Sequence, residues 1–126
     1  GLVGVAAGTA YALMMDGSKA IAVCCIVDGA TEAGVFWESL NFVALHRLPI
    51  AYICENNGMS VDSPIAERQA RGISVRVAAF GVDVKSSVER ALAGARAGYP
   101  TFYEAKVKLE CDHINMGKML PSEVIA

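Results

Sequence analysis

Apolar residues follow two patterns along this chain: short continuous runs, and longer segments in which they recur every three or four positions. The runs at 20–27 (AIAVCCIV) and 49–54 (PIAYIC) do not alternate with polar residues. Such runs are typical of strands buried on both faces of a parallel sheet. A third strand is predicted at 101–109 (TFYEAKVKL), where apolar and polar residues alternate.

Helical periodicity predicts four helices, at 4–15, 34–47, 65–79 and 83–98. The first is rich in small residues, and Gly8 with its neighbouring alanines predicts close packing against another element. In the second, Phe36, Leu40 and Val43 form an apolar stripe. For the fourth, Asp83 is the predicted N-cap.

The order of these elements predicts the fold class. Because parallel strands need crossover connections, helices between successive strands indicate an α/β protein. We expect an open parallel sheet with helices on both faces. The 126 residues suit one domain, which we take to span 1–126.

Composition narrows the functional classes. Hydrophobic residues make up 54% of the chain and charged residues 19%, which predicts surface that another subunit covers. The net charge of −2 and the absence of long basic runs argue against binding to nucleic acid or an anionic membrane. The longest apolar run, at 20–27, is shorter than the roughly 20 residues of a membrane span. No signal-peptide pattern occurs, so we expect a cytoplasmic protein with reduced, buried cysteines.

Polar residues follow two of the predicted strands. Asp28 comes directly after the first, and Asn56 and Asn57 follow the second. Ligands of open parallel sheets collect at the carboxyl ends of the strands. Gly29 and Gly34 bracket a helix start, where free N–H groups favour a phosphate. A carboxylate and an amide oxygen there suit Mg²⁺, which shares oxygen ligands with phosphates.

A structural interpretation of the same residues stays open. Asp28 is also a suitable helix N-cap, and Asn-Asn-Gly at 56–58 is a common turn sequence.

The stretch 27–57 resembles the thiamine-diphosphate motif, which begins Gly-Asp-Gly and ends Asn-Asn. More closely, it resembles the alpha subunit of the thiamine-diphosphate-dependent 2-oxo acid dehydrogenase component, the group of the pyruvate, branched-chain and acetoin enzymes. The resemblance is close over 20–70 and looser over 1–19 and 72–113. The residues that carry it are DGA at 28–30, Gly34, Phe36, Glu38, Asn41, LP at 48–49 and ENN at 55–57.

The resemblance implies roles for individual residues. Asp28, the side chain of Asn57 and the main-chain carbonyl of Met59 would ligate Mg²⁺. Gly29 and Ala30 would contact the diphosphate through their backbone.

Two further positions come from more distant parts of the match. GLVG at 1–4 resembles the segment that passes the aminopyrimidine ring, which would place Gly1 and Val3 against the cofactor. His113 falls where the family has an active-site histidine, although a surface histidine is an equal alternative.

The chain also departs from the family pattern. Val27 replaces the first motif glycine, and the sequence around His113 (LECDHINMGKM) lacks the family's loop motifs. The stretch 79–84 is shorter than the family's, which carries another strand. The family's N-terminal part has no counterpart, so either the sequence is a fragment or a separate chain supplies that part.

The function implied is that of a subunit of a thiamine-diphosphate-dependent enzyme that decarboxylates a 2-oxo acid or transfers an acyl or ketol unit. A beta-type partner subunit would supply the activating glutamate in a hetero-oligomer, and the substrate would be a small 2-oxo acid or ketose. Two alternatives remain: a transketolase-like activity, and a truncated, cofactor-free member with a structural or assembly role. Another nucleotide-binding protein is disfavoured because the chain has no GxGxxG or Walker sequence.

Overall fold

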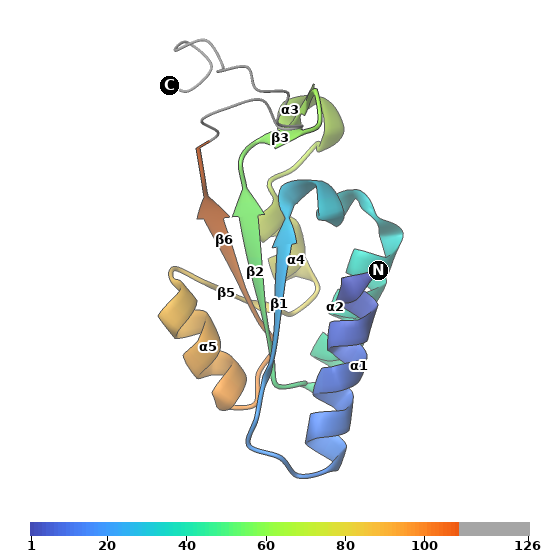
Figure 1. Ribbon diagram of the computed structural model, residues 1–126, viewed down its shortest axis with the longest axis vertical. Coiled ribbons are helices and arrows are strands. Elements are labelled where there is room, and N and C mark those ends of the chain that lie inside the picture. The colour runs from blue at the N-terminus through green and yellow to red at the C-terminus, as the bar shows by residue number, and fades with distance from the viewer. Residues whose placement is uncertain (109–126) are drawn as a thin grey trace.

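Four parallel strands form one sheet, in the order β1 (Ala22–Val27), β2 (Ile50–Asn56), β6 (Thr101–Lys106) and β5 (Asp83–Lys85). The computed structural model describes residues 1–108. β1, β2 and β6 are the three strands predicted from the sequence, two from apolar runs and one from alternation, and their parallel pairing confirms the predicted α/β class (Figure 1).

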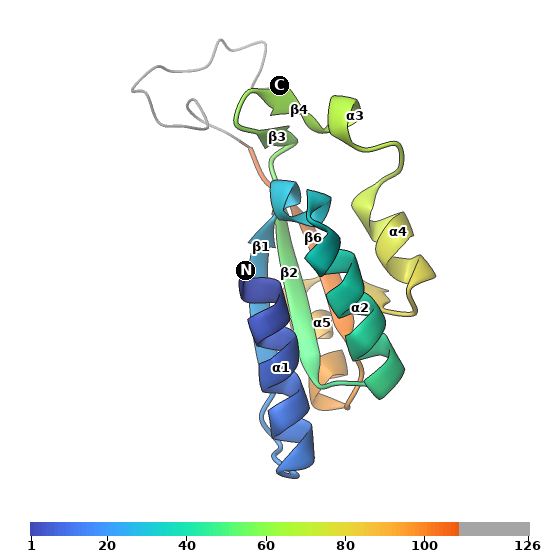
Figure 2. The same cartoon turned by 90° about the vertical axis from the view of Figure 1, so that its right-hand side faces the viewer.

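Helices cover both faces of the sheet, as predicted. On one face lie α1 (Leu2–Met15), α2 (Gly34–His46) and α4 (Ile73–Ala79), which share the larger apolar core. On the other lies α5 (Val88–Arg96), which packs on a smaller cluster (Figures 1 and 2). Within residues 1–108, no helix is long and apolar enough to cross a bilayer.

The prediction that the first strand is buried on both faces is wrong, whereas it is right for Ile50–Cys54 of β2. β1 lies at the edge of the described sheet and alternates. Cys24 is buried against the helices, but Val23 and Val27 are 48% and 47% exposed on the other face. The reason is that α5 covers β2, β6 and β5 and does not extend over β1.

The predicted helix at 65–79 is two separate helices, α3 (Ile65–Arg68) and α4. Gln69 ends α3 in an extended conformation (φ −132°, ψ 118°), and Gly72 starts α4 as its N-cap. Tertiary contacts stabilise the break, because the side chains of Arg68 and Gln69 both form hydrogen bonds with the segment 28–32.

The prediction of a helix that starts at Asp83 is also wrong. Residues 83–85 form β5, in which Val84 pairs beside Phe102 of β6. The helix begins after Ser87, whose hydroxyl accepts a hydrogen bond from the backbone N–H of Arg90 (3.3 Å).

The helix α1 packs through its alanines, as predicted, but not through Gly8. Val3, Ala7 and Ala10 are its buried positions, whereas Gly8 faces away from the core and an added Cβ there would have no atom of the described residues within 4 Å. Gly8 therefore makes no close packing contact.

Candidate functional site

Two connections meet at the carboxyl end of the sheet. β1 runs directly into the 3-10 helix η1 (Asp28–Glu32), and β2 is followed by a hairpin of β3 (Met59–Ser60) and β4 (Ser63–Pro64). They approach so closely that a Cβ on Gly29 would lie 2.8 Å from the Ser60 hydroxyl oxygen. The two ends of the stretch 28–57 thus lie side by side, as the sequence predicted.

Asp28 is completely buried, and its two carboxylate oxygens differ. Oδ2 accepts a hydrogen bond from Arg68 Nη2 at 2.7 Å. Oδ1 is buried and has no hydrogen-bond partner among residues 1–108. The N-cap of η1 is Val27, and no side chain caps it, so the N-cap interpretation of Asp28 is not what the structure shows. A buried carboxylate oxygen without a partner is costly, which marks this atom as a candidate ligand-binding position.

Arg68 connects the turn at 28–32 to the hairpin. Besides Asp28, it donates from Nη1 to Glu32 Oε1 at 2.9 Å and from Nε to the carbonyl oxygen of Ser63 at 3.2 Å. The adjacent Gln69 donates to the hydroxyl of Thr31 at 2.9 Å and also to Glu32. These contacts could not be predicted from the sequence, because Arg68 lies 40 positions from Asp28 within a predicted helix.

The two asparagines after β2 build the turn there. The side-chain oxygen of Asn56 accepts from the N–H of Gly58, and that of Asn57 accepts from the N–H of Met59, both at 2.8 Å. Gly58 has a φ of 79°, which favours glycine. The turn interpretation of Asn-Asn-Gly is therefore confirmed. It leaves a ligand role open for Asn57, because an amide oxygen has two lone pairs.

Asn56 is directed towards β6. Its Nδ2 donates to Glu104 Oε1 at 2.6 Å, and Ser74 of α4 donates to Glu104 Oε2 at 2.5 Å. Burial raises the pKa of Glu104, but hydrogen bonds from Lys106, Ser74 and Asn56 outweigh burial and hold that pKa below its ordinary value. Asn56 thus belongs to a polar cluster that joins β2, β6 and α4.

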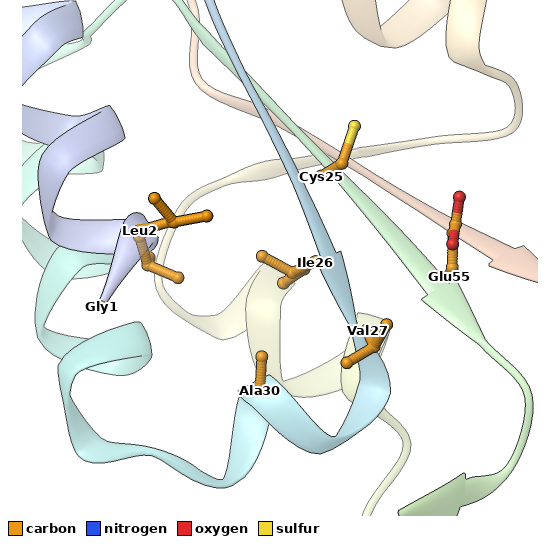
Figure 3. A pocket seen from close by; sticks show the side chains of 8 residues that line it. Gly1, Leu2, Cys25, Ile26, Val27, Ala30 and Glu55 are labelled. Atoms are coloured by element: carbon orange, nitrogen blue, oxygen red, sulfur yellow. The ribbon is translucent and has the colours of Figure 1, made fainter. Parts of the chain in front are cut away.

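A cavity of about 340 Å³ opens beside η1 (Figure 3). In Figure 3, Leu2 of α1 and Ile26 of β1 border it and Ala30 faces it from η1. Its lining is mainly apolar and includes three residues singled out from the sequence, Gly1, Val3 and Ala30. Sequence reasoning missed the other lining residues, which are Leu2, Cys25, Ile26, Val27 and Glu55.

The cysteines near the site differ in exposure. All three described cysteines are free thiols, as expected, but Cys25 is exposed, contrary to the prediction that the cysteines are buried. Burial raises the pKa of Cys54 to about 12, and Glu104 adds to the effect, so that thiol stays protonated near neutral pH. Cys111 and the predicted catalytic residue His113 lie outside the described residues.

The fold and the site define an α/β protein in which one strand-to-helix turn, η1, carries a buried carboxylate, Asp28, and lines an apolar cavity through Ala30. The chain belongs to the dehydrogenase E1 component family, whose model matches residues 2–86. This membership confirms the resemblance that the motif at 27–57 indicated.

Curated relatives agree with this family. The chain is 41% identical over 78 residues to the mitochondrial 2-oxoisovalerate dehydrogenase subunit alpha 1 of Arabidopsis thaliana, a match that covers 61% of this chain and 16% of the relative. It is 30% identical over 105 residues to the pyruvate dehydrogenase E1 component subunit alpha of Staphylococcus aureus, covering 71% of this chain and 28% of the relative. The matches thus span less than a third of these relatives' length.

A solved structure supports the fold. An X-ray structure of a protein from Mycobacterium smegmatis, described as a candidate thiamin diphosphate-dependent enzyme, superposes with a TM-score of 0.64 at 24% identity. The match covers 82% of this chain and 21% of that one.

Proposed function

We propose that this chain is the part of a thiamine-diphosphate-dependent 2-oxo acid dehydrogenase alpha subunit that holds the cofactor's diphosphate and its Mg²⁺. The observation that carries the proposal is that Oδ1 of the fully buried Asp28, at the carboxyl end of β1, has no hydrogen-bond partner in the described residues 1–108. Family membership supports it, since the curated relatives bear names of dehydrogenases that act on 2-oxo acids.

The residues present fit a hard divalent cation. Asp28 Oδ1, the side-chain oxygen of Asn57 and the carbonyl oxygen of Met59 are the proposed ligands, and oxygen atoms are what Mg²⁺ prefers. Gly29 and Ala30 would offer backbone N–H groups to the diphosphate. The tight contact of Gly29 with Ser60 supports this arrangement, because it brings η1 against the hairpin that carries Met59.

The apolar cavity fits the remainder of the cofactor. Gly1 and Val3 line it together with Ala30 of the proposed diphosphate turn, so one ligand could reach both places. When bound, thiamine diphosphate supplies the electron sink for decarboxylation of a 2-oxo acid. Asp28, Asn57 and Met59 would hold the metal, and Gly29 and Ala30 would hold the diphosphate. His113 remains the proposed active-site histidine.

The whole enzyme is proposed to be a hetero-oligomer with a beta-type subunit that supplies the activating glutamate. Exposed apolar residues, among them Val23 and Val27 of β1, are compatible with a partner that covers them. A small 2-oxo acid is the proposed substrate, with a ketose as the alternative. The cytoplasm remains the proposed location, although the Arabidopsis relative is named as mitochondrial.

Calorimetric titration tests the proposal. Thiamine diphosphate is titrated into the complete protein assembled with its beta-type subunit, with and without Mg²⁺. We expect binding that requires Mg²⁺ and is lost in Asp28→Asn, a variant that keeps the size of the side chain but not its charge. Asp62→Asn is the matched control, because Asp62 is an exposed carboxylate in the nearby hairpin and should not affect binding. Absence of binding would instead favour the cofactor-free structural subunit.

Alkylation of Cys25 gives an independent readout. Cys25 is exposed and lines the cavity, whereas Cys24 and Cys54 are buried. We expect iodoacetamide to label Cys25 in the folded protein, and thiamine diphosphate with Mg²⁺ to slow that labelling, as measured by peptide mass spectrometry. Equal labelling rates with and without the cofactor would contradict the placement of its ring beside Gly1 and Val3.

A further inference from the structure

We propose that Arg68 is a positioning residue for the metal-binding carboxylate. Its guanidinium holds Oδ2 of Asp28 at 2.7 Å, and the other oxygen, Oδ1, has no hydrogen-bond partner within the described part of the chain. Held in this way, Asp28 presents Oδ1 alone to the metal. The inference rests on the function proposed above and adds to it a residue that acts through Asp28.

The contacts of Arg68 fix its guanidinium in place. Three different nitrogens donate to three acceptors: Nη2 to Asp28, Nη1 to Glu32 and Nε to the carbonyl oxygen of Ser63. Only 14% of the Arg68 side chain is exposed. A planar guanidinium held at three corners has little freedom to rotate, so the Asp28 oxygen bound to it is fixed as well.

The local charge remains suited to a cation. Asp28 and Glu32 each carry a negative charge and share the single positive charge of Arg68, so the three groups together are net negative. Glu32 thus keeps Arg68 from cancelling the attraction of the site for a metal ion.

The contact between Arg68 and Asp28 also fits a second role, in which Arg68 competes with the metal. If the guanidinium were a substitute for the metal, the two cations would compete for Asp28, and removal of Arg68 would strengthen metal binding. The geometry favours positioning, because Arg68 contacts only one of the two oxygens and has two further acceptors outside Asp28. Partners of metal-ligating carboxylates typically affect metal affinity by 10–100-fold. The two roles therefore predict changes of opposite sign.

Mn²⁺ titration followed by the electron paramagnetic resonance signal of the free ion separates the two roles. The titration is performed on the complete protein with its beta-type subunit and a fixed concentration of thiamine diphosphate. We expect Arg68→Met to weaken Mn²⁺ binding by roughly 10–100-fold. Arg68→Lys should bind Mn²⁺ with an intermediate affinity, because its ammonium group keeps the charge but not the planar arrangement of three donor nitrogens. Arg71→Met, which removes an exposed positive charge three positions away, is the control and should bind as the unsubstituted protein does.

Circular dichroism excludes a general loss of structure. If Arg68 acts through Asp28, Arg68→Met should weaken Mn²⁺ binding while it keeps the spectrum of the unsubstituted protein. If Arg68→Met does not fold, as judged by circular dichroism, Arg68→Lys carries the test by itself. Unchanged or tighter Mn²⁺ binding in either variant would overturn the positioning role while leaving the proposed function intact. Failure of the unsubstituted protein to bind Mn²⁺ with thiamine diphosphate would overturn both.

Discussion

Individual residues set the distance between the two halves of the candidate site. Gly29, in the turn after β1, and Ser60, in the hairpin after β2, lie so close that a Cβ on Gly29 would be 2.8 Å from the Ser60 hydroxyl oxygen and 3.2 Å from its Cβ. The hydroxyl can rotate away, but the Cβ of Ser60 is part of the hairpin and moves only with the backbone. A side chain at position 29 would therefore have to push Ser60 away from η1.

We expect Gly29→Ala to lower the free energy of unfolding by about 1–3 kcal/mol, the usual cost of overpacking. Urea denaturation measures this change. Gly34→Ala is the control, because an added Cβ there meets no atom within 4 Å. Replacing Ser60 by glycine in the Gly29→Ala background should recover most of the loss. A Gly29→Ala variant as stable as the Gly34→Ala variant would contradict the close approach.

Which site residues the sequence could predict depended on how far apart the interacting residues lie along the chain. Asp28 could be identified because it directly follows an apolar run, and parallel strands end at one edge of a sheet. Its partner Arg68 could not, because the pairing is made by tertiary packing across 40 positions. The surroundings of Glu104 were missed for the same reason, since its partners Asn56 and Ser74 are 48 and 30 positions away.

Among the secondary-structure elements, α5 depends on a glycine and α1 does not. Gly94 of α5 lies over Thr101 of β6, and an added Cβ would be 2.6 Å from Thr101 Cγ2. Thr101 cannot rotate without cost, because it is buried and its hydroxyl donates to the carbonyl oxygen of Ala91 at 2.8 Å. Gly8 of α1, by contrast, faces open space.

The same substitution should therefore have opposite effects in the two helices. We expect Gly8→Ala to stabilise the protein by about 0.5–1 kcal/mol, because alanine is the better helix former. Gly94→Ala should destabilise it by about 1–3 kcal/mol, since overpacking exceeds that gain. Thermal unfolding of the two variants beside the unsubstituted protein measures both. A stabilised Gly94→Ala variant would show that α5 does not pack on β6 through Gly94.

The elements that the sequence predicted correctly are those with a long, uniform pattern. The strand at 49–54 and the helix at 34–47 are examples, with ends that differ by at most two residues from those of β2 and α2. β5 was missed because three residues are too few to show a period, and Asp83 looked like a helix cap. The break between α3 and α4 was missed because it is stabilised by contacts of Arg68 with Asp28 and of Gln69 with Thr31. Such distant contacts do not change the spacing of apolar residues along the chain.

The candidate site lies at the carboxyl end of the sheet, and the polar cluster around Glu104 joins the elements that meet there. Glu104 extends from β6 and accepts hydrogen bonds from Asn56 of β2 and Ser74 of α4. Asn56 also orders the turn that carries Asn57 and Met59. The protonation of one carboxyl group thus bears on three elements and on the turn of the proposed metal site.

This arrangement predicts how stability depends on pH. Because the pKa of Glu104 is lower in the folded protein than in the unfolded chain, Glu104 stabilises the fold above the unfolded pKa of about 4.3. That contribution is lost as the pH falls through the lower pKa of the folded state. We expect Glu104→Gln to be less stable near pH 7 and to lose less stability between neutral and acidic pH, as measured by urea unfolding across that range. Glu67→Gln, which changes an exposed carboxylate of α3, should follow the unsubstituted protein. If the free energies of unfolding of Glu104→Gln and of the unsubstituted protein changed in parallel with pH over the whole range, the ionised Glu104 would not stabilise the carboxyl end of the sheet.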